Sequence, residues 1–183
     1  RTLPAGEPIG VRPGTLDRVI VAETNLYKHY NPPGFEIGQN DIVLDIGAQI
    51  GTFAIMAANL AKKGRVIALE PEKNNFSLFR ENISLNKITN ILPLNQAVSN
   101  KASQGLLHLS ADNTGGHSLL TGAVSGRQKV FQPVETTTLA NIIKSNKLKR
   151  INFLKIDIER GEYEILLNLS DSILKKIDKI SME

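Results

Sequence analysis

The chain has 183 residues, of which 41% are hydrophobic and 22% charged, and this composition suits one compact domain with a sizeable core. It contains no cysteine, which excludes a disulfide framework, a thiolate metal site and a cysteine nucleophile. The lack of cysteine also fits the reducing cytoplasm, where we expect the protein to be located.

The formal net charge of +4 raises the question of a nucleic-acid partner. Residues 144–150 carry four cations and no acid, so the rest of the chain is balanced. We interpret this run as the solvated end of a helix, where cations interact favourably with the last carbonyl groups. Because the sequence also lacks an aromatic platform for stacking bases, a nucleic-acid partner is not expected. It shows neither a signal peptide nor an apolar span, so no membrane partner is expected either.

The first 40 residues are rich in proline and glycine and contain one short apolar piece at 18–22. Tyr27, Tyr30 and Phe35 form an aromatic cluster in the same region. We therefore expect a lead-in or cap over 1–40, followed by one main domain over 41–183. Because the chain begins with Arg1, we also expect it to be a fragment of a longer product.

The pattern of residues 42–51 is that of a buried strand that ends in a tight glycine turn and opens a helix. The strand is predicted over 42–46, with Asp45 at its carboxyl end, where the ligands of open α/β sheets bind. Gly47 and Gly51 would let the backbone approach a nucleotide-like ligand that a Cβ would obstruct. The helix is predicted over 51–62.

A second acid follows at the end of the next predicted strand, 65–70, which ends in Glu70. An acid about 20 residues after the glycine turn is placed to accept hydrogen bonds from ribose hydroxyls. Glycine turns after apolar strands also occur in proteins that bind no nucleotide, but the position of Glu70 favours a ligand that contains a ribose.

The rest of the chain continues to alternate strands and helices, which indicates a mostly parallel, doubly wound sheet. Pro93 should keep its strand near a sheet edge, because proline cannot donate to the ladder. The remaining predicted elements are a helix over 73–86, a strand over 90–98, short strands over 105–110 and 129–135, a helix over 136–148, a strand over 151–158, a helix from about 161 and a strand over 179–183.

The strand over 151–158 carries an unusual concentration of charge. Strict alternation places Lys155, Asp157 and Glu159 on one side and apolar residues on the other. Charges on a buried strand are costly unless they are paired or used. We interpret Lys155 as a structural ion-pair partner, whereas Asp157 lies at the strand end that faces the ligand crevice.

Several segments, in order along nearly the whole chain, resemble the FkbM family of S-adenosylmethionine-dependent methyltransferases. The most discriminating is the Lys-Ile-Asp-Ile-Glu run that is followed by Gly-Glu, and the lead-in over 11–17 with Glu23 and Tyr30 is also similar. The segments are VLDIGAQIG (43–51), ALEP (68–71), QAVS (96–99), TTL (137–139) and LKIDIERGEYEIL (154–166).

The resemblance implies a Rossmann-like α/β fold of the class I methyltransferase type and S-adenosylmethionine as cofactor. Its cofactor site would consist of Asp45, Gly47, Ala48, Gly51, Glu70, Gln96 and Ala97. The first four would surround the amino-acid and ribose parts, Glu70 would hold the ribose hydroxyls, and the last two would border the adenine. Asp157 would lie beside the methyl donor and the acceptor, a hydroxyl of a small molecule or a carbohydrate.

Two departures from the family pattern bear on this expectation. Position 49 is Gln where the family usually has Asn, and Gln tolerates a left-handed backbone less well, so we expect an altered turn or weaker cofactor binding. The chain also stops at Glu183, so strands six and seven of the fold, with part of the acceptor pocket, are expected to be missing.

An alcohol acceptor must lose a proton during methyl transfer, so the site needs a carboxylate or an imidazole within reach. Asp157 and Glu159 are the carboxylate candidates for this catalytic role. His117 lies in the glycine-flanked run Thr-Gly-Gly-His-Ser and is the imidazole candidate. A metal-assisted variant, in which Asp157, Glu159 and Glu183 bind Mg²⁺ through oxygens, is also open.

Other classes of protein fit the motifs less well. An NAD-dependent dehydrogenase usually carries Gly-x-Gly-x-x-Gly, whereas Gly47 and Gly51 are separated by Ala48, Gln49 and Ile50. The run Asn-Pro-Pro-Gly at 31–34 precedes the first strand, so it reads as a turn and not as the site of a nucleic-acid amino-methyltransferase. A cofactor-binding domain without catalysis remains the non-enzyme alternative.

Overall fold

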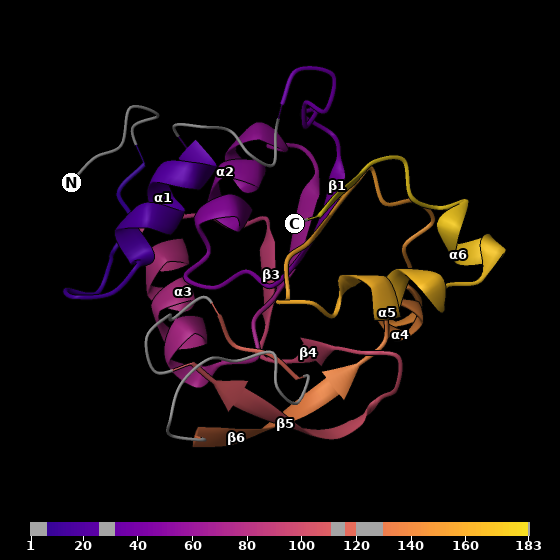
Figure 1. Ribbon diagram of the computed structural model, residues 1–183. Coiled ribbons are helices and arrows are strands. Elements are labelled where there is room, and N and C mark those ends of the chain that lie inside the picture. Colours follow the sequence, from indigo (N-terminus) through magenta and orange to yellow (C-terminus); the bar gives the residue numbers. More distant parts are fainter. Residues whose placement is uncertain (1–6, 26–31, 111–115, 120–129, 183) are drawn as a thin grey trace.

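A five-stranded parallel sheet forms the centre of the molecule (Figure 1). The computed structural model describes residues 7–25, 32–110, 116–119 and 130–182, and all structural statements refer to these. The strand order is β3-β2-β1-β7-β8. These strands are β1 (Ile42–Ile46), β2 (Arg65–Leu69), β3 (Ile91–Leu94), β7 (Phe153–Ile156) and β8 (Ile180–Met182).

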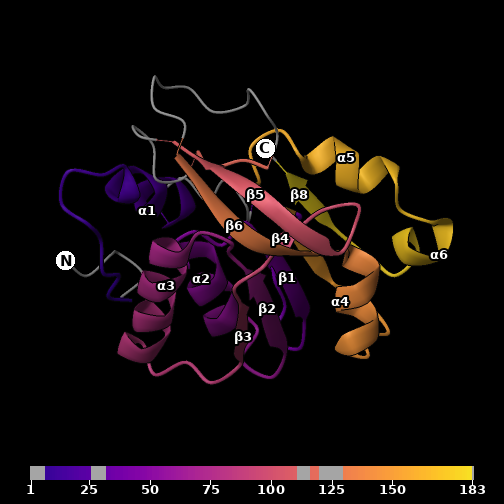
Figure 2. The same cartoon turned by 90° about the horizontal axis from the view of Figure 1, so that it is seen from below.

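Helices cover both faces of this sheet, as the end-on view in Figure 2 shows. Val43 packs with Ala57 and Phe79 on one face, whereas Leu44 packs with Ile142 and Ile165 on the other. The predicted doubly wound arrangement is therefore confirmed. The helices are α1 (Asp17–Asn25), α2 (Thr52–Leu60), α3 (Lys73–Leu85), α4 (Leu139–Ser145), α5 (Glu162–Leu167) and α6 (Asp171–Leu174).

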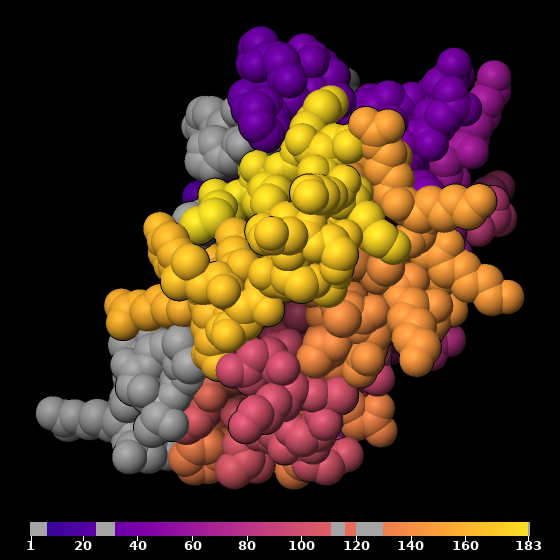
Figure 3. Space-filling model, turned by 90° about the vertical axis from the view of Figure 1, so that its right-hand side faces the viewer, coloured from indigo at the N-terminus to yellow at the C-terminus, as the bar shows by residue number. Residues whose placement is uncertain are grey.

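A second sheet of three strands, β4 (Ala97–Val98), β5 (Ser103–Leu109) and β6 (Val130–Thr137), lies below the parallel sheet in Figure 1. β5 and β6 are antiparallel, while β4 and β6 are parallel. In Figure 3 the yellow C-terminal segments lie between the indigo N-terminal part and the rose strands of this sheet. Segments far apart in sequence therefore share one face of the molecule.

The predicted elements are largely present, with differences at their ends. The predicted strand over 90–98 divides between the two sheets as β3 and β4, and β3 is an edge strand, as Pro93 indicates. The predicted helix over 136–148 begins only at Leu139, because residues 136–137 belong to β6 and pair with β4, and the Thr138 side chain caps the helix. Helix α1 was not predicted as a helix; only its apolar piece was recognised.

None of the helices in the described part of the chain is long and apolar enough to cross a bilayer.

Candidate functional site

A pocket of about 500 Å³ opens at the carboxyl edge of the parallel sheet. It is lined by residues at the ends of β1, β2 and β7, by one face of α1, and by parts of β4 and β5. Its position is the one where open α/β sheets bind their ligands. Of the predicted site residues it brings together Gly47, Ala48, Glu70, Gln96, Ala97, His117, Asp157 and Glu159.

The glycine turn after β1 forms the floor of this pocket. Gly47 and Gly51 both have φ 86°, and the backbone amides of Gly47 and Ala48 donate to the Leu69 carbonyl at 3.0 and 2.9 Å. A Cβ on Gly47 would lie 1.8 Å from the Asp157 carbonyl oxygen. Packing inside the protein therefore already excludes a side chain at Gly47, and close approach of a ligand to this turn stays a prediction.

Gly51 and Asp45, two predicted cofactor residues, do not line the pocket. A Cβ on Gly51 would lie 2.0 Å from a ring carbon of Phe79, so this glycine allows α2 and α3 to pack closely. Asp45 is fully buried behind the turn. Their assignment to the cofactor site stays a prediction.

Gln49 adopts the left-handed conformation, with φ 51°. Its backbone N–H donates to Glu70 Oε2 at 2.8 Å, and its side-chain Nε2 donates to Asp17 Oδ1 at 3.0 Å. Its Oε1 accepts from the Ile50 backbone at 2.9 Å. The tight turn is therefore retained despite Gln at this position, because the side chain is held at both of its polar atoms.

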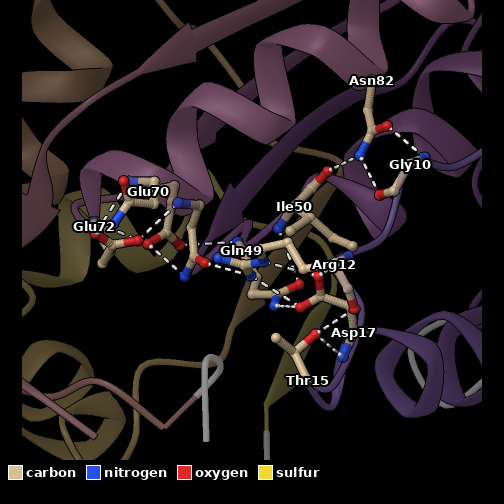
Figure 4. Close-up of polar contacts among 11 residues, drawn as sticks. Gly10, Arg12, Thr15, Asp17, Gln49, Ile50, Glu70, Glu72 and Asn82 are labelled. Atoms are coloured by element: carbon tan, nitrogen blue, oxygen red, sulfur yellow. Dashed lines mark hydrogen bonds and ion pairs between the residues drawn. The ribbon is translucent and has the colours of Figure 1, made fainter. Parts of the chain in front are cut away.

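Glu70 lies just after β2, lines the pocket and is 5% exposed. Its carboxylate accepts hydrogen bonds from the backbone N–H groups of Gln49 and Glu72, and Asn75 Nδ2 lies 3.4 Å from Oε1 (Figure 4). Burial raises the pKa of Glu70 to about 7, although these hydrogen bonds oppose the shift. The group therefore changes charge near neutral pH.

Lys155 and Asp45 form a buried cross-strand pair between β7 and β1. Lys155 Nζ lies 3.2 Å from Asp45 Oδ1 and 3.5 Å from Asp157 Oδ2, and it donates to the Gly47 carbonyl at 3.0 Å. Burial raises the pKa of Asp45. Burial by itself would lower the pKa of Lys155, but Asp45 and Asp157 outweigh it and the pKa is raised. The predicted structural ion pair of Lys155 is confirmed.

The two carboxylate candidates lie on a sharply turned segment directly after β7. Asp157 faces the pocket with 25% of its side chain exposed, and Glu159 also lines it. Glu159 and Arg160 have φ 58° and 76°, and Ser118 Oγ donates to the Glu159 carbonyl at 2.9 Å. Burial raises the pKa of Glu159, and the charges of Asp157 and Glu162 add to the effect. The predicted strand over 151–158 ends at Ile156 because of this turn.

His117 lines the same pocket but is held differently from the carboxylates. Its Nδ1 accepts a hydrogen bond from the Ser110 backbone at 3.0 Å, so the proton of the neutral ring lies on Nε2. Burial lowers the pKa of His117; the charge of Glu72 opposes this shift and that of Arg12 adds to it. Because its one basic nitrogen is occupied, this arrangement argues against His117 as the group that accepts a proton.

Gln96 and Ala97 lie at the start of β4, where the chain passes from one sheet to the other. Gln96 Nε2 donates to Glu135 Oε2 at 3.2 Å, and Ala97 is buried. Both line the pocket, and Asn95, the residue before Gln96, donates through Nδ2 to the Glu70 and Pro71 carbonyls at 2.8 and 3.1 Å. Their assignment to the border of the adenine stays a prediction.

Sequence reasoning missed two parts of the pocket. One is the face of α1 with the residue just before the helix, and it contributes Leu16, Val19, Ile20, Glu23 and Thr24. Their spacing of three and four residues is a helical signal that was present in the sequence. The other is Thr52, a buried residue that lines the pocket and whose Oγ1 has no hydrogen-bond partner among the described residues.

Within the described ranges, no group of three or more His, Cys, Asp or Glu side chains is arranged to hold a metal ion. The metal-assisted mechanism therefore has no preformed cluster among these residues. Glu183, its third predicted ligand, lies outside the described residues.

A parallel sheet of this strand order, with a glycine turn and an acid at the tips of neighbouring strands, defines a Rossmann-like α/β domain of the class I methyltransferase type. The profile of the Methyltransferase FkbM domain family matches residues 45–183. The chain therefore belongs to the FkbM methyltransferase domain family, and the resemblance stated from the sequence motifs is confirmed.

Three curated relatives are similar to this chain. AMB antimetabolite synthetase AmbE of Pseudomonas aeruginosa is 24% identical over 84% of this chain and 9% of that protein. Methyltransferase 1 of Beauveria bassiana is 21% identical over 79% of this chain and 64% of that protein. Hexuronic acid methyltransferase AglP of Haloferax volcanii is 25% identical over 75% of this chain and 54% of that protein. The chain thus spans less than two thirds of each relative's length.

Proposed function

We propose that the chain is an S-adenosylmethionine-dependent methyltransferase that transfers a methyl group to a hydroxyl of a small molecule or a sugar. The observation that carries this proposal is Glu70, a buried carboxylate that lines the pocket directly beside the glycine turn. A carboxylate in this position is suited to two adjacent ribose hydroxyls. The family of the chain and the relative that acts on a hexuronic acid support the reaction and the acceptor class.

The polar groups and the charge of the pocket support this cofactor. The unpartnered Thr52 hydroxyl supplies a polar group that a ligand can satisfy. Acids outnumber cations among the described pocket residues, which favours a positively charged sulfonium. The acids are Glu23, Glu70, Asp157, Glu159 and Glu164, and Lys155 is already paired with Asp45 and Asp157.

In this proposal Glu70 holds the ribose, the backbone of Gly47 and Ala48 borders the amino-acid end, and Gln96 with Ala97 borders the adenine. S-adenosylmethionine supplies an electrophilic methyl group when it is bound. The chain has to orient the acceptor oxygen along the line of attack and keep water out.

The acceptor hydroxyl has to lose its proton as the new carbon–oxygen bond forms, and Asp157 or Glu159 accepts it. Both line the pocket, and Lys155 Nζ lies 3.5 Å from Asp157 Oδ2. Burial raises the pKa of Glu159, which makes its carboxylate a stronger base than that of an ordinary glutamate.

Calorimetric titration with S-adenosylmethionine, with NAD as the control ligand, tests the cofactor. We expect heat with the first and none with the second. Mass spectrometry of candidate sugars and alcohols after incubation then tests the reaction, and we expect the mass gain of one methylene group. Tight binding without methylation of any acceptor would favour a non-catalytic domain, and heat with NAD alone would contradict the proposal.

A further inference from the structure

Gln49 contacts both the cofactor side of the pocket and the N-terminal helix. Its backbone N–H donates to Glu70 at 2.8 Å, and its side chain donates to Asp17, the first residue of α1, at 3.0 Å (Figure 4). Gln49 is 8% exposed and Asp17 is fully buried. One residue thus joins the two regions through short, water-excluded hydrogen bonds.

These contacts belong to a closed ring of hydrogen bonds. Arg12 Nη2 donates to Asp17 Oδ1 at 2.9 Å and to Asn75 Oδ1 at 2.7 Å, and Asn75 Nδ2 donates to Glu70 Oε1 at 3.4 Å. Burial alone would raise the pKa of Asp17, but its hydrogen bonds with Arg12 and Gln49 lower it to about 2. Asp17 is therefore a carboxylate at physiological pH, and hydrogen bonds to a carboxylate are stronger than those between neutral groups.

Helix α1, which this ring holds at its first residue, has two distinct faces. Val21 packs with Ile50 and Ile55 in a buried cluster on one side. On the other side Val19 lines the pocket together with Leu16, the residue just before the helix, although they are 49% and 42% exposed. Apolar side chains that remain this exposed inside a pocket are placed to be covered by a ligand.

We infer that Gln49 is a positioning residue that fixes α1 as one wall of the pocket and couples the order of that wall to cofactor occupancy. The inference rests on the proposed function. A ligand held by Glu70 restrains the Gln49 backbone, because both share the Glu70 carboxylate. The restrained side chain then holds Asp17, and with it the start of α1.

The length of the Gln49 side chain is what makes this coupling specific to the chain. Asn is shorter by one methylene group, so it cannot span the distance to Asp17 from the same backbone position. Asn is also the better residue for a left-handed backbone. Gln49→Asn therefore removes the link to α1 without straining the turn, which separates the coupling from the conformation of the loop.

The test compares amide hydrogen exchange in α1 with and without saturating S-adenosylhomocysteine, in the unaltered chain and in Gln49→Asn. We expect the ligand to slow exchange of the α1 amides about fivefold in the unaltered chain, the factor that one hydrogen bond of about 1 kcal/mol supplies. The effect should be lost in Gln49→Asn and reduced in Asp17→Asn. Thermal unfolding confirms that each variant is folded.

Asn59→Ala is the matched control. Asn59 Nδ2 donates to Glu7 Oε1, so it also joins α2 to the N-terminal segment, but it lies outside the pocket. We expect normal slowing in this variant. Binding of S-adenosylhomocysteine with equal α1 exchange in the unaltered chain and in Gln49→Asn would overturn the inference alone. Absence of binding heat in the unaltered chain would overturn the proposed function and the inference with it.

Discussion

Glu70 is the residue on which the binding chemistry depends most, and its charge should make binding sensitive to pH. Its pKa is raised from 4.5 to about 7 by burial, and only the carboxylate accepts hydrogen bonds from both ribose hydroxyls. We expect the affinity for S-adenosylhomocysteine to rise as pH increases from about 6 to 8, by up to about tenfold per unit below the pKa. Calorimetry across this range measures it.

The stability of the ligand-free protein should change with pH in the opposite direction and should fall as pH rises. A carboxyl whose folded pKa is raised contributes stability below its unfolded pKa, and this contribution is lost as pH rises towards 7.

Glu70→Gln should remove the pH dependence of binding, whereas Glu159→Gln should retain it. An affinity that does not change with pH in the unaltered chain would contradict the assignment of Glu70.

Lys155 has a structural role that a substitution should expose. Lys155→Met removes the only cation within ion-pair distance of Asp45 among the described residues, and it leaves a buried carboxyl without compensation. We expect a loss of about 3–5 kcal/mol in the free energy of unfolding. Arg150→Ala, which breaks the largely exposed Arg150–Asp178 pair, is the control and should cost less than about 1 kcal/mol. Denaturant unfolding that shows equal losses would refute the buried pair.

Substitution of the two candidate carboxylates should identify the proton acceptor. Asp157→Asn or Glu159→Gln, whichever removes the base, should lower the turnover of methyl transfer by about 10²–10⁴-fold with little change in cofactor affinity. His117→Gln should leave the pH profile of turnover unchanged, because Nδ1 is occupied by Ser110. Turnover of an acceptor found by mass spectrometry provides the measurement. Full turnover in both carboxylate variants would exclude these bases.

Much of this chemistry was readable from the sequence, since strand ends and spacing identify Glu70, Asp157 and Lys155. The ring around Asp17 was not readable, because it joins residues as far apart as Arg12 and Asn75. The burial of Asp45 away from the pocket was equally hidden. Spacing along one strand predicts the sheet edge at which a side chain lies. Whether that side chain is buried, and which charged group it pairs with, depends on the neighbouring strands.

At the scale of elements, the turn between β1 and α2 depends on a close contact with the segment after β7. Gly47→Ala places a Cβ 1.8 Å from the Asp157 carbonyl and in a left-handed backbone with φ 86°. Strain and overpacking together should cost about 3–5 kcal/mol of stability. Thermal or denaturant unfolding measures this loss.

Gly34→Ala is the matched control for that change. Gly34 also has a positive φ, 88°, but a Cβ there meets nothing within 4 Å. It should therefore show only the backbone strain of about 1–2 kcal/mol. If the two alanine variants lost the same stability, the contact between Gly47 and Asp157 would not be the reason for the glycine.

Elements with strong local patterns were predicted well, and those that depend on distant partners were not. The apolar runs of β1 and β2 predicted these two strands directly, and Pro93 predicted that β3 lies near a sheet edge. The division of 90–98 into β3 and β4 could not be predicted, because β4 leaves its neighbour to pair with β6. Helix α1 follows a Pro/Gly-rich stretch that obscured its helical spacing.

At the scale of the whole molecule, the pocket exists because the topology gathers segments that are remote in sequence. The parallel order brings the ends of β1, β2 and β7 to one edge, while α1 and the β4–β6 sheet close its sides. Alternation of strands and helices predicted the parallel sheet, and the family match over residues 45–183 confirms the class. The second sheet and the α1 wall, which line the pocket, emerged only from the structure.

The most direct test of the account is a calorimetric titration of S-adenosylhomocysteine into the unaltered chain and into Glu70→Gln. We expect one-to-one binding to the unaltered chain and an affinity at least about tenfold weaker in the variant, because a charged hydrogen-bond acceptor for the ribose is lost. Thermal unfolding of the variant shows that it remains folded. Absence of heat from the unaltered chain, or equal affinity in the two proteins, would contradict the account.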